Sequence, residues 1–268
     1  MKRYFLILGV SVISISGSLA VSANDRSTDL RNFPAASVDD VIVPVPSEVF
    51  NVLDKLGSPN WQGQLRSSMG KNSGDRVQVA LLLGTVIADG FVAVEAKDAE
   101  KVKEIGRDVV KLAAAISVKD AVMARSKSIV DKAEKNNWVE VRREFDGALQ
   151  DVRSAMQDLN DDALAQLVSL GGWIRGTEVL TALVDQEFKQ DKAELLHQPN
   201  LVIYFSKKLD SLPPKLKKDP LIAQIRKTLQ KMLPLLGAED GSKISQDDVK
   251  KINQMSSELV KAISAKNR

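Results

Sequence analysis

The chain has 268 residues, a formal net charge of +3, 4% aromatic residues and no cysteine. The lack of cysteine excludes disulfide-stapled folds, thiolate metal sites, thiol catalysis and the lipid attachment of bacterial lipoproteins. The scarcity of aromatic residues argues against a base-stacking platform for nucleic acid. Stability must therefore come from an ordinary hydrophobic core, and the chain is long enough to bury one.

Residues 1–23 have the features of a secretory signal peptide. Lys2 and Arg3 precede an apolar run over residues 4–13, and Val21-Ser22-Ala23 matches the small-residue pattern at a cleavage site, with Ser18-Leu19-Ala20 as a second choice. A bilayer-spanning helix needs about 20 apolar residues, so this run is too short to serve as an anchor. We therefore expect an exported, periplasmic or secreted protein with no transmembrane anchor after cleavage.

Residues 24–74 are expected to be extended or looped around one short helix. The segment 41–46, Val-Ile-Val-Pro-Val-Pro, disfavours a helix because each residue before a proline is pushed out of the α region. A short amphipathic helix is predicted over residues 47–56, and Gly57 is placed to end it. The Gly-, Ser- and Asn-rich residues 58–74 are typical of a loop, which Trp61 would anchor to the body of the protein.

From residue 75 to the C-terminus, apolar residues recur at helical spacing and period-two alternation is absent at length. The first helices are predicted over residues 75–96, 97–116, 118–135, 138–159 and 161–184. Whether Asp98 caps a new helix or lies inside a longer one stays open. The pair Asn136-Asn137 is expected to end the third of these helices.

Proline and capping residues divide the remaining chain. Pro199 is expected to break any helix over residues 195–209, and Pro213-Pro214 to act as a hard stop. Asp219 and Pro220 form a good N-cap and first-turn pair for a helix that reaches toward residue 236. After a turn at 237–241, Ser245 and Asp248 resemble a capping box that opens the last helix.

This pattern predicts an all-α fold, an antiparallel bundle of about seven to nine helices over residues 75–268. A division is possible near residues 187–213. Residues 189–268 contain 16 Lys and Arg against 9 Asp and Glu, a net charge of +7. Such a lysine-rich face could meet a membrane surface or an acidic partner, although a solvated helix surface has the same composition.

An internal similarity links the two most apolar helices. Sliding residues 75–92 by 87 positions onto residues 162–179 gives five identities in eighteen positions, including Gly84 with Gly171. An ancient repeat would explain the match, but so would convergence of two buried helices. The following helices do not match well, so both explanations stay open.

Glycines are concentrated in the same two helices. Each costs roughly 1 kcal/mol of helix stability relative to alanine, which suggests a compensating packing role. A missing side chain lets two helix backbones approach closely. We therefore expect close helix packing at Gly84, Gly90, Gly171, Gly172 and Gly176. The two helices are expected to be the most buried and to lie against each other.

Four charged residues interrupt these apolar helices, and they are the candidate ligand-binding residues: Asp89, Glu95, Arg175 and Glu178. A buried charge is costly unless it is paired, and Asp89 with Arg175 is the simplest pairing. The four could line a small polar pocket for a ligand or an ion. A purely structural ion pair, with some of the charges in solvent, would also account for them.

No catalytic motif is recognisable. His197 is the only histidine, and no Gly-x-Ser-x-Gly elbow accompanies it. Glu194 and His197 have the Glu-x-x-His spacing of carboxylate-bridged metal bundles. Those bundles contain two such motifs, and this chain, with one histidine, contains only one. We therefore expect neither a bound metal nor a cofactor, and no phosphate-binding loop is present.

The sequence favours a non-catalytic helical binding or scaffold protein of the cell envelope. A small-molecule or lipid carrier, with its ligand in the bundle core, is the alternative. A hydrolase or carboxylate-based metal enzyme is the weakest of the three hypotheses. The partner is expected to be an envelope protein or a small molecule rather than nucleic acid, and the sequence does not fix the oligomeric state.

Overall fold

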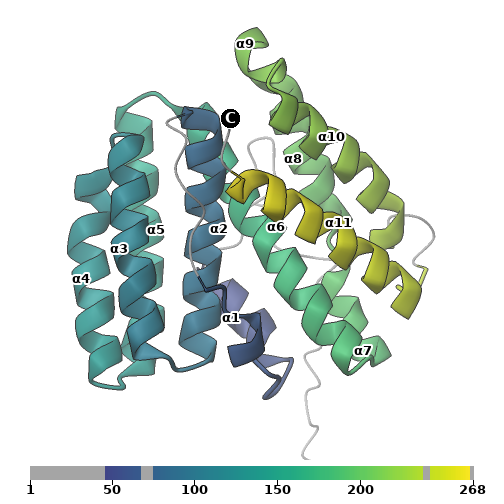
Figure 1. The fold of residues 1–268 in the computed structure, drawn as a ribbon, viewed down its shortest axis with the longest axis horizontal. Coiled ribbons are helices and arrows are strands. Elements are labelled where there is room, and N and C mark those ends of the chain that lie inside the picture. The colour runs from purple at the N-terminus through teal and green to yellow at the C-terminus, as the bar shows by residue number, and fades with distance from the viewer. Residues whose placement is uncertain (1–45, 68–74, 238–241, 266–268) are drawn as a thin grey trace, which may run out of the picture.

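The computed structural model describes residues 46–67, 75–237 and 242–265 (Figure 1). The predicted signal peptide, the predicted extended segment that follows it, residues 68–74 of the predicted loop and residues 238–241 of the turn predicted over 237–241 lie outside the described residues. The described part of the chain is helical and contains no strand, so the all-α prediction is confirmed. Its α-helices are α1 (Pro46–Asp54), α2 (Arg76–Glu95), α3 (Ala99–Ala115), α4 (Lys119–Glu134), α5 (Trp138–Asp158), α6 (Asp162–Gln186), α7 (Gln190–Ala193), α8 (Pro199–Ser211), α9 (Pro214–Lys217), α10 (Pro220–Met232) and α11 (Gln246–Ser264).

The number of helices predicted for residues 75–268, seven to nine, was too low, because the described residues of this range form ten α-helices. α7 and α9 contain four residues each, too few to produce a periodic pattern. Three short 3-10 segments, η2 (Gln62–Gln64), η3 (Glu194–Leu196) and η4 (Leu233–Leu236), complete the described helical elements.

Side-chain caps begin several of the helices, including α2, α3, α6, α10 and α11, and those at Asp219 and Ser245 were predicted. Asp98 accepts a hydrogen bond from the backbone N–H of Lys101 at 2.9 Å, so it caps a new helix, α3. Ser245 and Asp248 form the expected capping box of α11. The expectation for Pro199 was right in part: the helical run breaks at residues 197–198, between η3 and α8, but Pro199 itself begins a helix. It occupies the first turn of α8, where its missing N–H would have no helical partner in any case.

The helices form two groups that meet at α2 and α6 (Figure 1). Helices α2 to α5 lie side by side in one group. In the other, α11 packs on α6, while α8 and α10 pack against each other. Helix α1 packs on α5, and Trp61 is buried as predicted, with 7% of its surface exposed. The two central helices therefore hold the groups together.

Helices α2 and α6 cross in direct backbone contact at Gly84 and Gly171. A Cβ atom added to Gly84 would lie 1.9 Å from the carbonyl oxygen of Val168, and one added to Gly171 would lie 2.0 Å from that of Leu81. The predicted close approach of these helices is therefore confirmed. The contact is reciprocal with the same offset of 87 residues, but two helices that cross at glycines produce such symmetry without a duplication.

The packing role predicted for all five glycines holds only in part. A Cβ on Gly172 would lie 3.4 Å from the carbonyl oxygen of Gly84, which is an ordinary van der Waals contact between the two helices. Gly90 instead faces the Phe145 ring, at 3.4 Å from an added Cβ. The prediction was wrong for Gly176, because nothing lies within 4 Å of a Cβ there. Its missing side chain leaves open space.

Within the described residues, α2 and α6 are long and apolar enough to cross a membrane by length and composition. Their most apolar 18-residue windows have mean hydropathies of 2.0 and 1.2, and 89% and 67% of these windows are buried in the protein. A buried core helix has the same composition as a membrane span. The burial of both helices matches the prediction that they form the core.

Candidate functional site

An apolar cavity of about 310 Å³ extends from the interior of the α2–α5 group to α6. Its walls come from α1 to α6, from α8, and from residues around η3 and η4. The cavity therefore draws on segments that span most of the described chain, and it is partly open to solvent. Its volume is at the lower end of the range that small-molecule sites occupy in proteins.

The lining contains few polar side chains, namely Arg125, Ser126, Ser169, Thr177 and Gln198. Several of these are already bonded within the protein. The Ser169 hydroxyl donates to the Ala165 carbonyl oxygen at 3.1 Å, and Gln198 Oε1 accepts from Trp173 Nε1 at 3.1 Å. Water in the cavity would find few partners, so the site suits an apolar occupant.

Glycines and half-buried apolar side chains both line the cavity. Gly90, Gly172 and Gly176 line it without side chains, and Gly176 is exposed, with nothing within 4 Å of an added Cβ. The large apolar side chains along the walls, such as Ile87 and Trp173, pack on the core but remain only half-buried. Half-buried side chains of this kind gain further burial when an apolar ligand covers them.

Aromatic rings form the wall beside α1. The Phe91 centroid lies 4.8 Å from both the Phe50 and the Phe145 centroids. The Arg142 guanidinium lies 4.7 Å above the Phe50 ring and donates two 2.8 Å hydrogen bonds to the Asp54 carboxylate. Helix α1 is thus fastened to α5 by an ion pair and by ring contacts.

Glu95 belongs to this contact between α1 and α5 and not to the predicted polar pocket. Its carboxylate accepts a 2.6 Å hydrogen bond from Arg142. Burial raises the pKa of Glu95 above its ordinary value, and the positive charge of Arg142 offsets part of that rise. The proposed grouping of Glu95 with the other three charged residues was therefore wrong. It lies at the C-terminal end of α2, more than a helical turn beyond Asp89.

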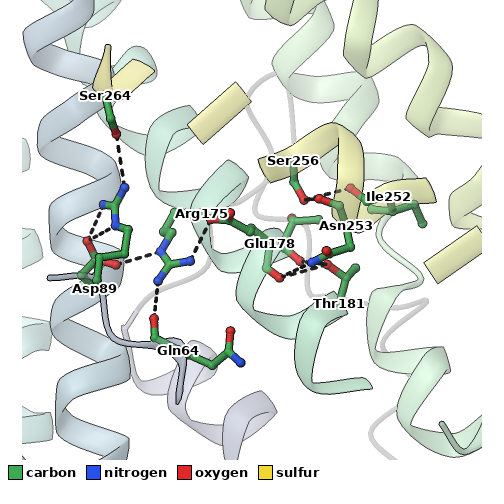
Figure 2. Close-up of polar contacts among 11 residues, drawn as sticks. Gln64, Asp89, Arg175, Glu178, Thr181, Ile252, Asn253, Ser256 and Ser264 are labelled. Atoms are coloured by element: carbon green, nitrogen blue, oxygen red, sulfur yellow. Dashed lines mark hydrogen bonds and ion pairs between the residues drawn. The ribbon is translucent and has the colours of Figure 1, made fainter. Parts of the chain in front are cut away.

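The other three predicted residues do come together (Figure 2). Arg175 Nε donates to Asp89 Oδ1 at 2.8 Å, and Arg175 Nη1 donates to Glu178 Oε2 at 2.7 Å. The predicted Asp89–Arg175 ion pair is confirmed, and only 4% and 9% of the Arg175 and Asp89 side chains are exposed. Neither residue lines the cavity.

Arg66 completes this cluster and was missed by the sequence analysis. Its Nε donates to Asp89 Oδ2 at 2.9 Å, and Arg175 Nη2 donates to the Gln64 carbonyl oxygen at 2.6 Å (Figure 2). Arg66 lies in a loop with no periodic pattern, so no sequence signal paired it with a core carboxylate. The charges are matched within the protein, which indicates a structural cluster.

The cluster continues into α11. Arg66 Nη1 donates to Ser264 Oγ at 3.3 Å, and Asn253 Nδ2 donates to the Glu178 carbonyl oxygen at 2.9 Å (Figure 2). Together these bonds join the loop before α2, helix α2, helix α6 and helix α11. The predicted role of these charges was to bind a ligand. The bonds give them another role, which is to hold these four elements of the fold together.

The remaining candidate is a metal site at Glu194 and His197. Within the described part of the chain, no further ligands surround these two side chains. Among the described residues, no group of three or more His, Cys, Asp or Glu could hold a metal ion. Glu194 accepts a hydrogen bond from Gln190 at 3.0 Å, and the His197 ring lies against Gly237. A metal centre built on this step would need ligands from elsewhere.

No protein-family model, curated protein or solved structure matches the chain. The cavity and its lining therefore carry the functional argument.

A carboxylate between α4 and α5 makes stability depend on pH. Glu144 accepts hydrogen bonds from Lys132, from Arg125 at 3.0 Å and from Ser128 at 2.9 Å, and they lower its pKa from 4.5 to about 2, with Lys132 the main cause. A lowered pKa stabilises the folded state above pH 4.5, and this contribution is lost as the pH falls toward 2.

Glu144→Gln is therefore expected to cost about 1–2 kcal/mol at pH 7 and almost nothing near pH 2, measured by urea unfolding. Glu187→Gln is the control. Its side chain is 62% exposed, so water screens its ion pairs and the loss should be smaller. Equal losses at both pH values would contradict this assignment for Glu144.

Proposed function

We propose that this chain is a non-catalytic binding protein that holds an apolar small molecule, such as a lipid acyl chain, in the cavity lined mainly by α1 to α6. The observation that carries the proposal is the nearly apolar lining of the 310 Å³ cavity. Ligand sites are concave, mostly apolar and largely preformed, with a few polar groups. The cavity has each of these properties.

The free energy of apolar burial also favours a ligand. Burial of apolar surface contributes roughly 25 cal/mol per Å², so an acyl chain that covers half-buried walls gains from both surfaces. Tight packing is the rule in protein cores, and a large void forfeits dispersion contacts. A cavity kept open by glycine at a stability cost is expected when its space is used.

The cavity can be filled from one position to test this proposal. Gly176→Phe would place a ring at the part of the cavity that opens to solvent, whereas Gly176→Ala adds only a methyl group at the same site. We expect the wild type and Gly176→Ala to bind the neutral dye N-phenylnaphthylamine with enhanced fluorescence, and palmitic acid to displace it. Gly176→Phe should weaken dye binding by ~10-fold or more, about 1.4 kcal/mol.

Two outcomes of the dye experiment would contradict the proposal. Equal dye affinity in all three proteins would place the dye outside the cavity and contradict the proposal. Absence of dye binding by the wild type would contradict it too. Melting curves of the variants provide the folding control.

The site of action proposed for this activity is the cell envelope. Lys2 and Arg3, the apolar run after them and the small residues at 21–23 support cleavage and export. N-terminal sequencing of the protein from its host should start near Asn24 or Val21. Recovery of intact Met1 in the membrane fraction would contradict export.

A further inference from the structure

Three consecutive helices, α8 to α10, contain a concentration of positive charge. Residues 207–231 contain eight Lys and Arg against two Asp and Glu, a net charge of +6. Both acidic side chains have partners other than lysine. The Asp219 carboxylate caps α10 by accepting a hydrogen bond from the Leu221 N–H at 2.8 Å, and Asp210 Oδ1 lies 3.5 Å from Arg226 Nε. The acidic residues of this region therefore do not form ion pairs with its lysines.

Most of the cations face solvent. Lys207, Lys215, Lys218, Lys227 and Lys231 are exposed, and Lys217 is partly exposed. Among the described residues, none of these six forms a hydrogen bond or an ion pair. We call these six lysines the basic surface. Helix α9, which contains two of them, projects at one end of the molecule (Figure 1).

We propose that the basic surface docks the protein onto an anionic lipid bilayer. Lysine ammonium groups act as point charges without the planar geometry that suits a single carboxylate or phosphate partner. An anionic membrane surface attracts each such charge, and the contributions of several lysines accumulate. The chemistry of the surface therefore fits a diffuse layer of lipid phosphates.

An acidic protein partner fits less well. Stable protein interfaces are centred on buried aromatic or aliphatic anchors. Among the described residues, the exposed large hydrophobic side chains are Met123, Val139, Leu159 and Ile203, and only Ile203 lies on these three helices. Ile203 is one helical turn from Lys207, so the two share a face of α8, which suits contact with a lipid interface.

The position of α8 links this docking to the cavity. Phe205, two residues from Ile203 and Lys207, lines the cavity from the opposite side of the same helix. A bilayer bound at the basic surface would thus lie on the outer side of a cavity wall. The inference goes beyond the proposed function, because it names the surface from which an apolar ligand is taken or to which it is delivered.

Vesicle sedimentation tests this docking with the full mature chain. At low salt we expect the protein to sediment with vesicles of phosphatidylcholine containing phosphatidylglycerol, but not with phosphatidylcholine alone. Binding should fall steeply between about 0.05 and 0.5 M NaCl, as the Debye length shortens. The triple variant Lys215→Gln, Lys217→Gln, Lys218→Gln should bind the anionic vesicles ~10-fold more weakly or worse.

A matched triple variant controls for net charge. Lys119, Lys127 and Lys135 are exposed lysines on or beside α4, and their replacement by Gln should leave vesicle binding unchanged. Equal loss in both triple variants, or no binding to anionic vesicles at low salt, would overturn the docking. Dye binding without vesicles, measured on the same proteins, separates the two claims. It should survive in the Lys215–Lys218 variant and reports on the cavity alone.

Discussion

Gly84→Ala and Gly171→Ala are each expected to lower the free energy of unfolding by about 3 kcal/mol or more, whereas Gly176→Ala should leave it unchanged or raise it by up to about 1 kcal/mol. At Gly84 and Gly171 the new methyl group would meet a backbone carbonyl oxygen of the facing helix at 1.9 and 2.0 Å. Backbone cannot rotate away as a side chain can, so the helices must separate and lose contacts along their length.

Urea unfolding of the three variants measures this difference. The Gly176 variant is the matched control, because it changes the same residue type in α6 without any atom within 4 Å of the new Cβ. Failure of the Gly84 or Gly171 variant to fold agrees with the expectation. Losses below 1 kcal/mol at either position would show that the two helices do not meet at these glycines.

Asp89→Ala is expected to cost about 3–5 kcal/mol, more than Arg175→Ala. Removing the carboxylate leaves Arg66 and Arg175 facing each other, with Arg175 almost fully buried. Removing Arg175 leaves Asp89 with its second partner, Arg66, so the carboxylate is not stranded. In Asp89→Ala, Arg175 keeps Glu178 and the Gln64 carbonyl oxygen. The larger loss in this variant therefore comes from Arg66, which keeps only Ser264 among the described residues, and from the repulsion between the two guanidinium groups.

A double-mutant cycle tests the pairing directly. The combined Asp89→Ala and Arg175→Ala protein should lose less stability than the sum of the two single losses, by about 1 kcal/mol or more. Additive losses would contradict a direct interaction between the two side chains. Arg66→Ala should weaken the protein less than Asp89→Ala, since 22% of the Arg66 side chain is exposed.

The sequence predicted the core helices well, because their boundaries depend on local signals. The Asp and Ser caps mark helix starts through bonds to N–H groups two or three residues away, and such bonds need no tertiary context. The Asp89–Arg175 pair was predictable for a related reason. Each charge interrupts an apolar helix, and a buried charge requires a partner.

The remaining features depend on tertiary arrangement. Arg66 joins the buried cluster from a loop, and Glu95 pairs with Arg142 on α5, 47 residues away. Gly176 resembled a packing glycine in the sequence, because composition does not reveal whether a neighbouring helix fills the space of a missing side chain. The cavity is lined by nine helical segments, α1 to α6, α8, η3 and η4, so no single motif in the sequence predicts it.

Native mass spectrometry of protein purified from its own host without detergent would test the central claim most directly. The wild type is expected to show, beside the mass of the polypeptide, a second species heavier by one apolar small molecule. Gly176→Phe should appear only at the polypeptide mass, and Gly176→Ala should behave as the wild type. A wild type that remains at the bare polypeptide mass, both from the host and after incubation with palmitic acid, would contradict a ligand-binding cavity.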